Sequence, residues 1–376
     1  MNIKKLIIYL FFIGLISGLI IFAISFTNPK NWFYKSPSFD GVPFEKNLSL
    51  ENSSFSEDGL KGLEDFLKTE AGTTSMLVIE NGKAVFEYGD VAEISIIASI
   101  RKSILAMLYG KYVDKNLIDL QEKIGKIGID EDDGLLPIEK QATVFDLLTS
   151  RSGVFHIPSN GGYDLKNIKE RGSKEPGSYF VYNNWDFNAA GFVLETKTGK
   201  SVYEELENQL VIPLGFQDWN IKNQKRKVNE DKSRYSAYHM HLSTRDVAKI
   251  GQLMLQKGNW NGDQLIPTEW IHKITTPVTP MDTISKRDEL EKDHPIQFSY
   301  GMLWWVFEKF NDNPDFKGAY TASGSGGQYI TVIPKRNVVI SHKSNMDIQS
   351  MAGISDRRRT PSWKYWMILE KLMDRK

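Results

Sequence analysis

Ser99 and Lys102 form a Ser-x-x-Lys pattern where an apolar stretch begins. Residues three apart share one face of a helix, so the Lys102 amine would reach the Ser99 hydroxyl if the stretch is helical. A neutral lysine in that place could take the serine proton and create a nucleophile. The alternative is an N-cap serine followed by a surface lysine, because the tetrad alone is common. Arg101 is interpreted as a surface residue or a residue behind the site.

A second candidate pair is Tyr182 and Asn184, which form a Tyr-x-Asn pattern in a loop ahead of a small helix. The phenol could move a proton, and the asparagine amide could hold a lysine or a substrate carbonyl. The alternative is a buried loop tyrosine followed by a capping asparagine.

A third candidate is the run of small residues from Thr321 to Gly327, which leads into an apolar strand pattern. Small side chains let a substrate lie against the backbone and accept N–H hydrogen bonds, as an oxyanion site for acyl transfer requires. The alternative is an ordinary glycine-rich turn into an edge strand.

In this order and at these separations, the three motifs resemble the serine β-lactamase and penicillin-binding-protein superfamily. The chain looks most like the class C β-lactamase-related branch, which includes carboxylesterases, D-aminopeptidases and 6-aminohexanoate-dimer hydrolases. The resemblance covers roughly Phe66–Lys343. Supporting stretches are Leu147–Val154, Leu242–Gly251, Tyr300–Trp305 and Gly326–Gln328.

The resemblance implies a role for each motif residue. Ser99 would be the acylated nucleophile, Lys102 its near partner, and Tyr182 the relay of protons to and from the leaving group. Asn184 takes the place of the motif asparagine. The implied reaction has two steps, in which Ser99 attacks an ester or amide carbonyl and water then releases the acyl group.

The implied oxyanion hole combines the backbone N–H of Ser99 with that of Ser325, next to Gly324. A gap of one or two residues in the motif would move the second donor to Gly326 or Gly327. Sequence does not decide whether Lys102 or Tyr182 is the base.

The third motif departs from the family pattern, because Ala322-Ser323-Gly324 stands where relatives often have Lys-Thr-Gly or His-x-Gly. The missing cation removes a charge-assisted contact with a substrate carboxylate, which contributes on the order of 1.5–3 kcal/mol. We therefore expect an amidase or esterase that acts on a less anionic acyl group. The alternatives are a cell-wall-fragment binding or sensing module that is acylated slowly or not at all, and a D,D-peptidase or β-lactamase.

The composition limits the other possibilities. Lys+Arg and Asp+Glu both number 47, so no net charge favours nucleic acid, and no cysteine is present for disulfides, thiol catalysis or metal binding. The histidines show no zinc-binding spacing. The expected partner is a small-molecule amide or ester substrate, without metal or cofactor, and the oligomeric state is left open.

The N-terminus predicts a membrane segment. Leu6–Phe26 carries no charge and follows two lysines, and its length suits a bilayer core. We expect residues 1–27 to be an uncleaved anchor with the catalytic domain outside the cytoplasm, or a signal segment if cleaved. In the second case the protein would be secreted or periplasmic.

The elements that must position these motifs indicate an α+β fold. Residues 28–54 read as a linker and 55–376 as the hydrolase domain, with an α/β lobe at about 55–110 and 235–376 and an inserted, mostly helical lobe at about 111–234. An antiparallel sheet flanked by N- and C-terminal helices is expected. Predicted helices are 58–70, the stretch after Ser99, 142–148, 188–195, 244–255 and 361–372; predicted strands are a hairpin over 76–88 turning at Asn81-Gly82, and 300–307, 328–333 and 338–342.

Overall fold

The structure is a computed structural model that describes residues 41–47, 50, 52–161, 166–287, 295–344 and 360–373. Its strands are β1 (Ser75–Glu80), β2 (Lys83–Gly89), β3 (Ser95–Ile96), β4 (Lys225–Asn229), β5 (Ser233–His239), β6 (His241–Leu242), β7 (Asn259–Trp260), β8 (Asp263–Gln264), β9 (Ile296–Tyr300), β10 (Trp305–Phe310), β11 (Tyr320–Gly324), β12 (Gln328–Ile333) and β13 (Val338–Lys343). Its α-helices are α2 (Glu57–Thr69), α3 (Ile100–Asp114), α4 (Ile124–Ile127), α5 (Val144–Leu148), α6 (Asn184–Thr198), α7 (Val202–Leu206), α8 (Ile212–Leu214), α9 (Thr244–Leu255), α10 (Thr268–Thr275), α11 (Met281–Arg287) and α13 (Ser362–Met373).

The hairpin at Asn81-Gly82 begins a seven-stranded sheet. Both residues have positive φ values, 53° and 79°, as a type I′ hairpin turn requires. The strand order is β2-β1-β13-β12-β11-β10-β9, and every neighbouring pair is antiparallel. The predicted antiparallel sheet is therefore confirmed.

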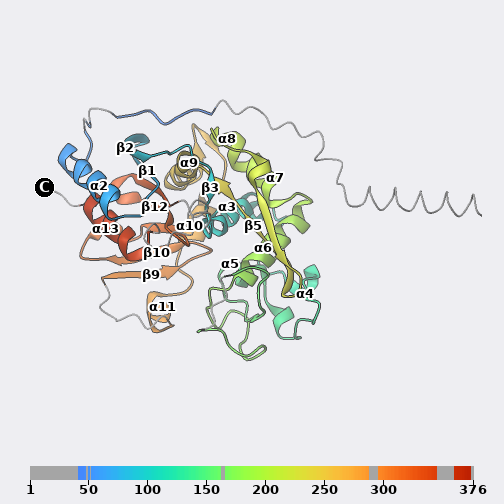
Figure 1. The fold of residues 1–376 in the computed structure, drawn as a ribbon. Coiled ribbons are helices and arrows are strands. Elements are labelled where there is room, and N and C mark those ends of the chain that lie inside the picture. The colour runs from blue at the N-terminus through green and yellow to red at the C-terminus, as the bar shows by residue number, and fades with distance from the viewer. Residues whose placement is uncertain are drawn as a thin grey trace, which may run out of the picture. The chain divides into compact units, whose positions relative to one another are not determined.

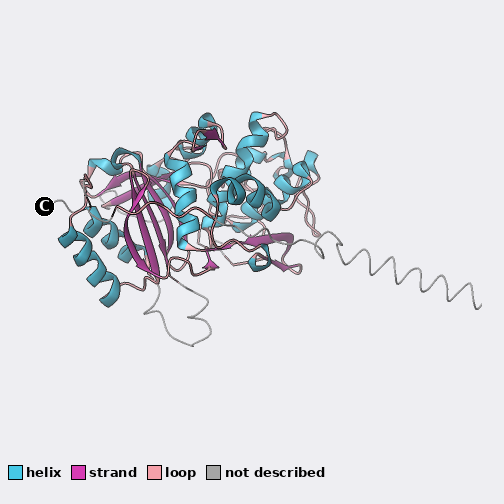
Figure 2. Ribbon diagram, turned by 90° about the horizontal axis from the view of Figure 1, so that it is seen from above, coloured by secondary structure: helices cyan, strands magenta, loops and turns pink. Residues whose placement is uncertain are grey.

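Helices cover both faces of this sheet, as Figure 2 shows. Met76 and Val78 of β1 belong to the core shared with α2 and α13, whereas Leu77 and Ile79 belong to the core shared with α3 and α9. Alternate residues of a strand face opposite sides, so one apolar strand supplies both cores. The terminal helices expected from the sequence flank the sheet in this way.

Helix α3 is buried along most of its length. All residues from Ile100 to Gly110 are buried, and the helix contacts β11, β12, α6, α7 and α10. A helix without a polar face belongs in the interior of a protein. Figure 1 places α3 between the sheet and the helices α5 to α7, so residues at its start lie where the two parts of the fold meet.

The region after α3 contains α4 to α8, in line with a mostly helical insertion, and it ends in the antiparallel hairpin of β4 and β5. The predicted bounds of the two lobes stay a prediction. The other predicted helices correspond to α2, α3, α5, α6, α9 and α13, and the strands at 328–333 and 338–342 to β12 and β13.

The strand predicted over 300–307 is wrong. β9 ends at Tyr300 and β10 begins at Trp305, and the chain turns between them. The Gly301 N–H donates to the Trp304 carbonyl oxygen at 2.9 Å, and Leu303 has a φ of 62°. The turn pairs these backbone groups with each other instead of with a neighbouring strand. The apolar character of the segment does not indicate such a turn.

The predicted membrane segment at 6–26 lies outside the described residues. Among the helices that the structure does describe, none combines the length and apolar character needed to cross a bilayer.

Candidate active site

Ser99 occupies the N-cap of α3, and its side chain makes no capping hydrogen bond. The chain segment just before Ser99 is held by the pairing of β3 with β6. In the same segment, the Ile97 N–H donates to the Met240 carbonyl oxygen at 3.0 Å. Ala98 has a φ of 46°, a left-handed conformation that costs a non-glycine residue energy. This backbone leaves the Ser99 hydroxyl uncommitted to the helix end.

Lys102 lies one helical turn further on and touches both other members of the predicted set. Its Nζ is 2.9 Å from Ser99 Oγ and 2.9 Å from the Tyr182 hydroxyl. The side chain is buried, and this burial, followed by the charge of Arg101, places the pKa of the Lys102 amine well below its usual value.

Two aromatic rings oppose part of that effect. Lys102 Nζ lies 4.2 Å from the ring centroid of Tyr182 and 4.5 Å from that of Phe187, and such faces favour an ammonium by roughly 2 kcal/mol when desolvated. Burial is the largest effect on the pKa of the Lys102 amine, and it lowers that pKa. The arrangement therefore favours a neutral amine beside Ser99.

Tyr182 is held in the loop before α6 by backbone and ring contacts. The neighbouring Val181 N–H donates to the Ser150 carbonyl oxygen at 3.0 Å. The Tyr182 ring stacks on Trp305 at 5.8 Å and packs against Phe187 at 4.9 Å. Burial raises the pKa of Tyr182 to about 12, against smaller opposing effects of Ser99 and Arg101. At neutral pH the group is a protonated phenol.

The run of small residues forms two segments, strand β11 and a turn at 325–327 that leads into β12. A Cβ added to Gly324 would lie 2.7 Å from the Ile97 carbonyl oxygen and 3.2 Å from the Ser99 nitrogen. Only a glycine lets β11 approach so closely. The end of β11, which leads into the turn at Ser325, therefore lies close to the Ser99 nitrogen.

Asn184 is the first residue of α6 and is buried. Its Nδ2 donates to the Gly161 carbonyl oxygen, while its Oδ1 is buried without a hydrogen-bond partner in the structure. The structure thus joins Ser99, Lys102 and Tyr182 by contacts of hydrogen-bond length, and directs the Asn184 amide nitrogen to a neighbouring loop.

A cavity of about 390 Å³ adjoins the Gly324 turn. It is lined by Ser323, Gly324, Ser325, Gly326, Gly327, Tyr329, Thr360, Pro361 and Ser362. None of these lining side chains is charged at neutral pH. Ala322 is buried within β11.

Arg101 was not found as a buried residue by sequence reasoning. Only 2% of it is exposed, because elements that are distant in the chain, including β5 and α6, pack against it. Its guanidinium lies 4.3 Å above the ring of Tyr238, and its Nη2 donates to Asn188 Oδ1 at 3.1 Å. The apolar run at 104–110 is the signal from which its burial could have been predicted.

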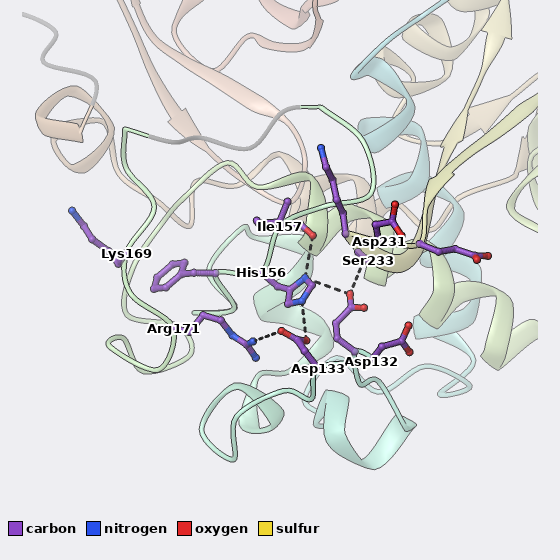
Figure 3. Close-up of a pocket in the computed structure, with 12 residues that line it drawn as sticks. Asp132, Asp133, His156, Ile157, Lys169, Arg171, Asp231 and Ser233 are labelled. Atoms are coloured by element: carbon purple, nitrogen blue, oxygen red, sulfur yellow. Dashed lines mark hydrogen bonds and ion pairs between the residues drawn. The ribbon is translucent and has the colours of Figure 1, made fainter.

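A pocket of about 470 Å³ lies elsewhere, in the part of the fold that contains α4 to α8 (Figure 3). His156 lies 3.1 Å from Asp133 Oδ1 through Nε2 and 3.0 Å from the Ile157 carbonyl oxygen through Nδ1. Arg171 also binds Asp133, at 3.1 Å. Charged groups of both signs pair with one another here, and the pocket contains none of Ser99, Lys102 and Tyr182.

Comparison with known proteins gives a consistent assignment. Residues 63–359 match the family model described as Beta-lactamase. An uncharacterized protein of Alkalihalophilus pseudofirmus is 25% identical over 263 residues, which are 65% of this chain and 71% of that protein.

Two solved structures share the fold. A Bacillus anthracis protein provisionally named a 6-aminohexanoate-dimer hydrolase superposes with a TM-score of 0.57 at 22% identity, over 83% of each chain. The octameric penicillin-binding protein homologue of Pyrococcus abyssi has a TM-score of 0.55 at 18% identity, over 82% of this chain and 80% of that one. At these identities the likeness establishes the β-lactamase/transpeptidase-like fold.

Proposed function

Because the chain belongs to the Beta-lactamase family, a family of serine hydrolases, we propose that it cleaves an amide or ester bond through an acyl-enzyme on Ser99. The observation that carries this proposal is the position of Lys102 Nζ, 2.9 Å from both Ser99 Oγ and the Tyr182 hydroxyl. A nucleophile, a base and a proton relay thus lie within hydrogen-bond distance of one another.

In the proposed acylation, neutral Lys102 accepts the proton as Ser99 Oγ attacks the substrate carbonyl carbon. The carbonyl oxygen becomes an oxyanion and accepts hydrogen bonds from the N–H groups of Ser99 and Ser325. When the tetrahedral intermediate collapses, the bond to the amine or alcohol breaks. Tyr182 donates its phenol proton to that leaving group and takes the proton held by Lys102.

In deacylation, the Tyr182–Lys102 pair first accepts a proton from water and then gives a proton to Ser99. A water molecule replaces the leaving group and gives one proton to the Tyr182–Lys102 pair while its oxygen attacks the acyl carbon. The Ser99 ester bond then breaks, and the proton returns to Ser99 Oγ. The carboxylic acid product leaves, and the three side chains regain their starting states.

The surroundings of the site support a substrate without an obligatory carboxylate. Among the residues that the structure describes, none that lines the cavity beside Gly324 is charged, and Ala322 offers no cation. The Bacillus anthracis relative carries the name of an amide hydrolase, which agrees with an amide or ester of a neutral acyl group. We propose that β-lactams are poor substrates.

The charge-free stretch at Leu6–Phe26 supports a further proposal, that the chain is anchored in the cell membrane with its catalytic domain outside the cytoplasm. A protease added to intact cells should then digest the domain, and protection of the domain would contradict the proposal.

The first experiment labels the purified full chain with a fluorophosphonate probe and follows release of p-nitrophenol from p-nitrophenyl acetate. We expect labelling and hydrolysis in the wild type and loss of both in Ser99→Ala, because only the hydroxyl can be phosphonylated or acylated. Nitrocefin should be hydrolysed slowly. Ser103→Ala is the matched control, since this serine instead donates to the Leu303 carbonyl oxygen. Absence of labelling in a folded wild type would favour a binding module, and rapid nitrocefin turnover would favour a β-lactamase.

A further inference from the structure

Arg101 is a buried cation next to the candidate base. It lies between Ser99 and Lys102 in the first turn of α3 and is 2% exposed. Its guanidinium is fixed by the Tyr238 ring on one side and by the Asn188 side chain on the other. These contacts hold the charge in one place.

No carboxylate neutralises this charge among the residues that the structure describes. Arg101 takes part in none of the ion pairs found there, and its Nη1 is buried without a hydrogen-bond partner. Buried charges in proteins are normally paired, since removing an ion from water costs several kcal/mol. An unpaired one beside a reactive lysine calls for an explanation.

The groups around Arg101 and Lys102 come from several elements. Tyr182 faces Lys102 from the loop before α6, Tyr238 and His239 approach from β5, and Tyr203 approaches from α7. None of them is a carboxylate. His239 has its pKa lowered to about 4 by burial and by Arg101, so it is neutral near pH 7. Asp186, on the same helix as Asn188, accepts instead from Ser152 Oγ at 2.6 Å.

We propose that Arg101 is a positioning residue for the acyl-enzyme reaction, whose fixed positive charge disfavours a second positive charge on Lys102 and so keeps that amine ready to accept the Ser99 proton. The proposal rests on the proposed function. In the step concerned, the proton moves from Ser99 Oγ to Lys102 Nζ, and Arg101 neither gains nor loses one.

The same charge has a second consequence. Once Lys102 has accepted the proton, repulsion from Arg101 favours its transfer onward through Tyr182 to the leaving group. Like charges repel more strongly in a buried site than in water, and the charge of Arg101 adds to burial in lowering the pKa of Lys102. Arg101 therefore keeps Lys102 neutral before the reaction and favours loss of the proton once Lys102 has accepted it.

The test measures kcat/KM for p-nitrophenyl acetate and the rate of fluorophosphonate labelling between pH 5 and pH 10. Activity should fall at acid pH as Lys102 becomes protonated. In Arg101→Met, which keeps an apolar stem, we expect the midpoint of this acid limb to rise by about one unit. The rate below the limb should then fall about tenfold, with recovery at higher pH. Arg101→Lys keeps a cation and should keep the wild-type midpoint.

A second variant guards against misfolding of Arg101→Met. Asn188→Asp has nearly the same shape and places a carboxylate against Arg101 Nη2, so it should also raise the midpoint. Lower activity at every pH with an unchanged midpoint in a folded Arg101→Met, or in Asn188→Asp if the former does not fold, would overturn the inference. Activity that persists in Ser99→Ala would instead overturn the proposed function.

Discussion

At the scale of single residues, the chemistry of the site depends on the protonation states of Lys102 and Tyr182. The pKa of Lys102 is pushed down, chiefly by burial, and that of Tyr182 is pushed up to about 12 by the same cause. Burial disfavours whichever form is charged, so it favours the neutral form of both groups. In the proposed mechanism, this arrangement lets the lysine accept a proton and the tyrosine donate one.

If Tyr182 is the proton donor, Tyr182→Phe should affect an amide substrate more than an ester substrate. An amide needs a proton on its leaving nitrogen, so kcat/KM for a p-nitroanilide should fall by about 10²-fold or more. A p-nitrophenolate leaves without a proton, so hydrolysis of the p-nitrophenyl ester should fall by less than about tenfold. Lys102→Met should abolish both reactions, because Ser99 loses its proton acceptor.

Steady-state rates with both substrates check this prediction. Tyr179→Phe is the matched control, since that tyrosine donates to the Asn167 carbonyl oxygen rather than to the site. Equal losses on ester and amide in Tyr182→Phe would contradict a role as leaving-group donor.

At the scale of elements, the decisive feature is the closeness of the end of β11 to the start of α3. β11 is held between β10 and β12, and α3 is fixed by its buried surface. Their relative position is therefore set by packed parts of the fold, and the proposed oxyanion donors at Ser99 and Ser325 would need no rearrangement to act.

Gly324→Ala tests this closeness. The added Cβ would lie 2.7 Å from the Ile97 carbonyl oxygen and 2.9 Å from Gln328 Cβ, so either β11 or the Ser99 backbone must move. We expect kcat for the p-nitrophenyl ester to fall by about 10²–10³-fold, the effect of losing one oxyanion donor.

Ser325→Ala is the control, because it keeps the backbone N–H and changes only an exposed side chain. It should retain most of the wild-type kcat, while circular dichroism and thermal melting confirm that both variants fold. Full activity in Gly324→Ala would place the second oxyanion donor elsewhere.

At the scale of the whole molecule, His342 of β13 links the turn between β11 and β12 to Thr73, which precedes β1. It is buried in β13, with Nδ1 2.8 Å from the Gly327 carbonyl oxygen and Nε2 2.8 Å from Thr73 Oγ1. Since the carbonyl oxygen only accepts, Nδ1 carries the hydrogen and Nε2 accepts from the threonine hydroxyl. The folded protein thus holds a neutral imidazole.

This contact predicts a loss of stability at acid pH. Burial lowers the pKa of His342 to about 4, whereas an unfolded histidine titrates near 6.5. Its contribution is present above about pH 6.5 and is lost as pH falls towards 4, by about 3 kcal/mol in the free energy of unfolding. Urea unfolding of the wild type at pH 7 and pH 4 measures this change.

His342→Gln is the matched variant, since an amide can bond to the same neighbours but does not titrate. The difference in stability between pH 7 and pH 4 should shrink by about the same 3 kcal/mol. An identical pH dependence in the two proteins would show that His342 does not govern it.

Local patterns in the sequence determined much of the fold. Asn81-Gly82 marks a turn, and the spacing of Leu63, Phe66 and Leu67 marks the buried face of α2, because these signals depend only on near neighbours along the chain. The order of the three motifs likewise indicated the family. The roles of the site residues remain predictions.

The tertiary structure alone decided the electrostatics of the site. Sequence placed Lys102 near Ser99 but left its charge open, and it interpreted Arg101 as a residue at the surface or behind the site. Burial depends on elements that are distant in the chain, such as β5 and α6 around Arg101, and so do pKa values. For the same reason, only the folded chain could bring Gly324 against the Ser99 nitrogen.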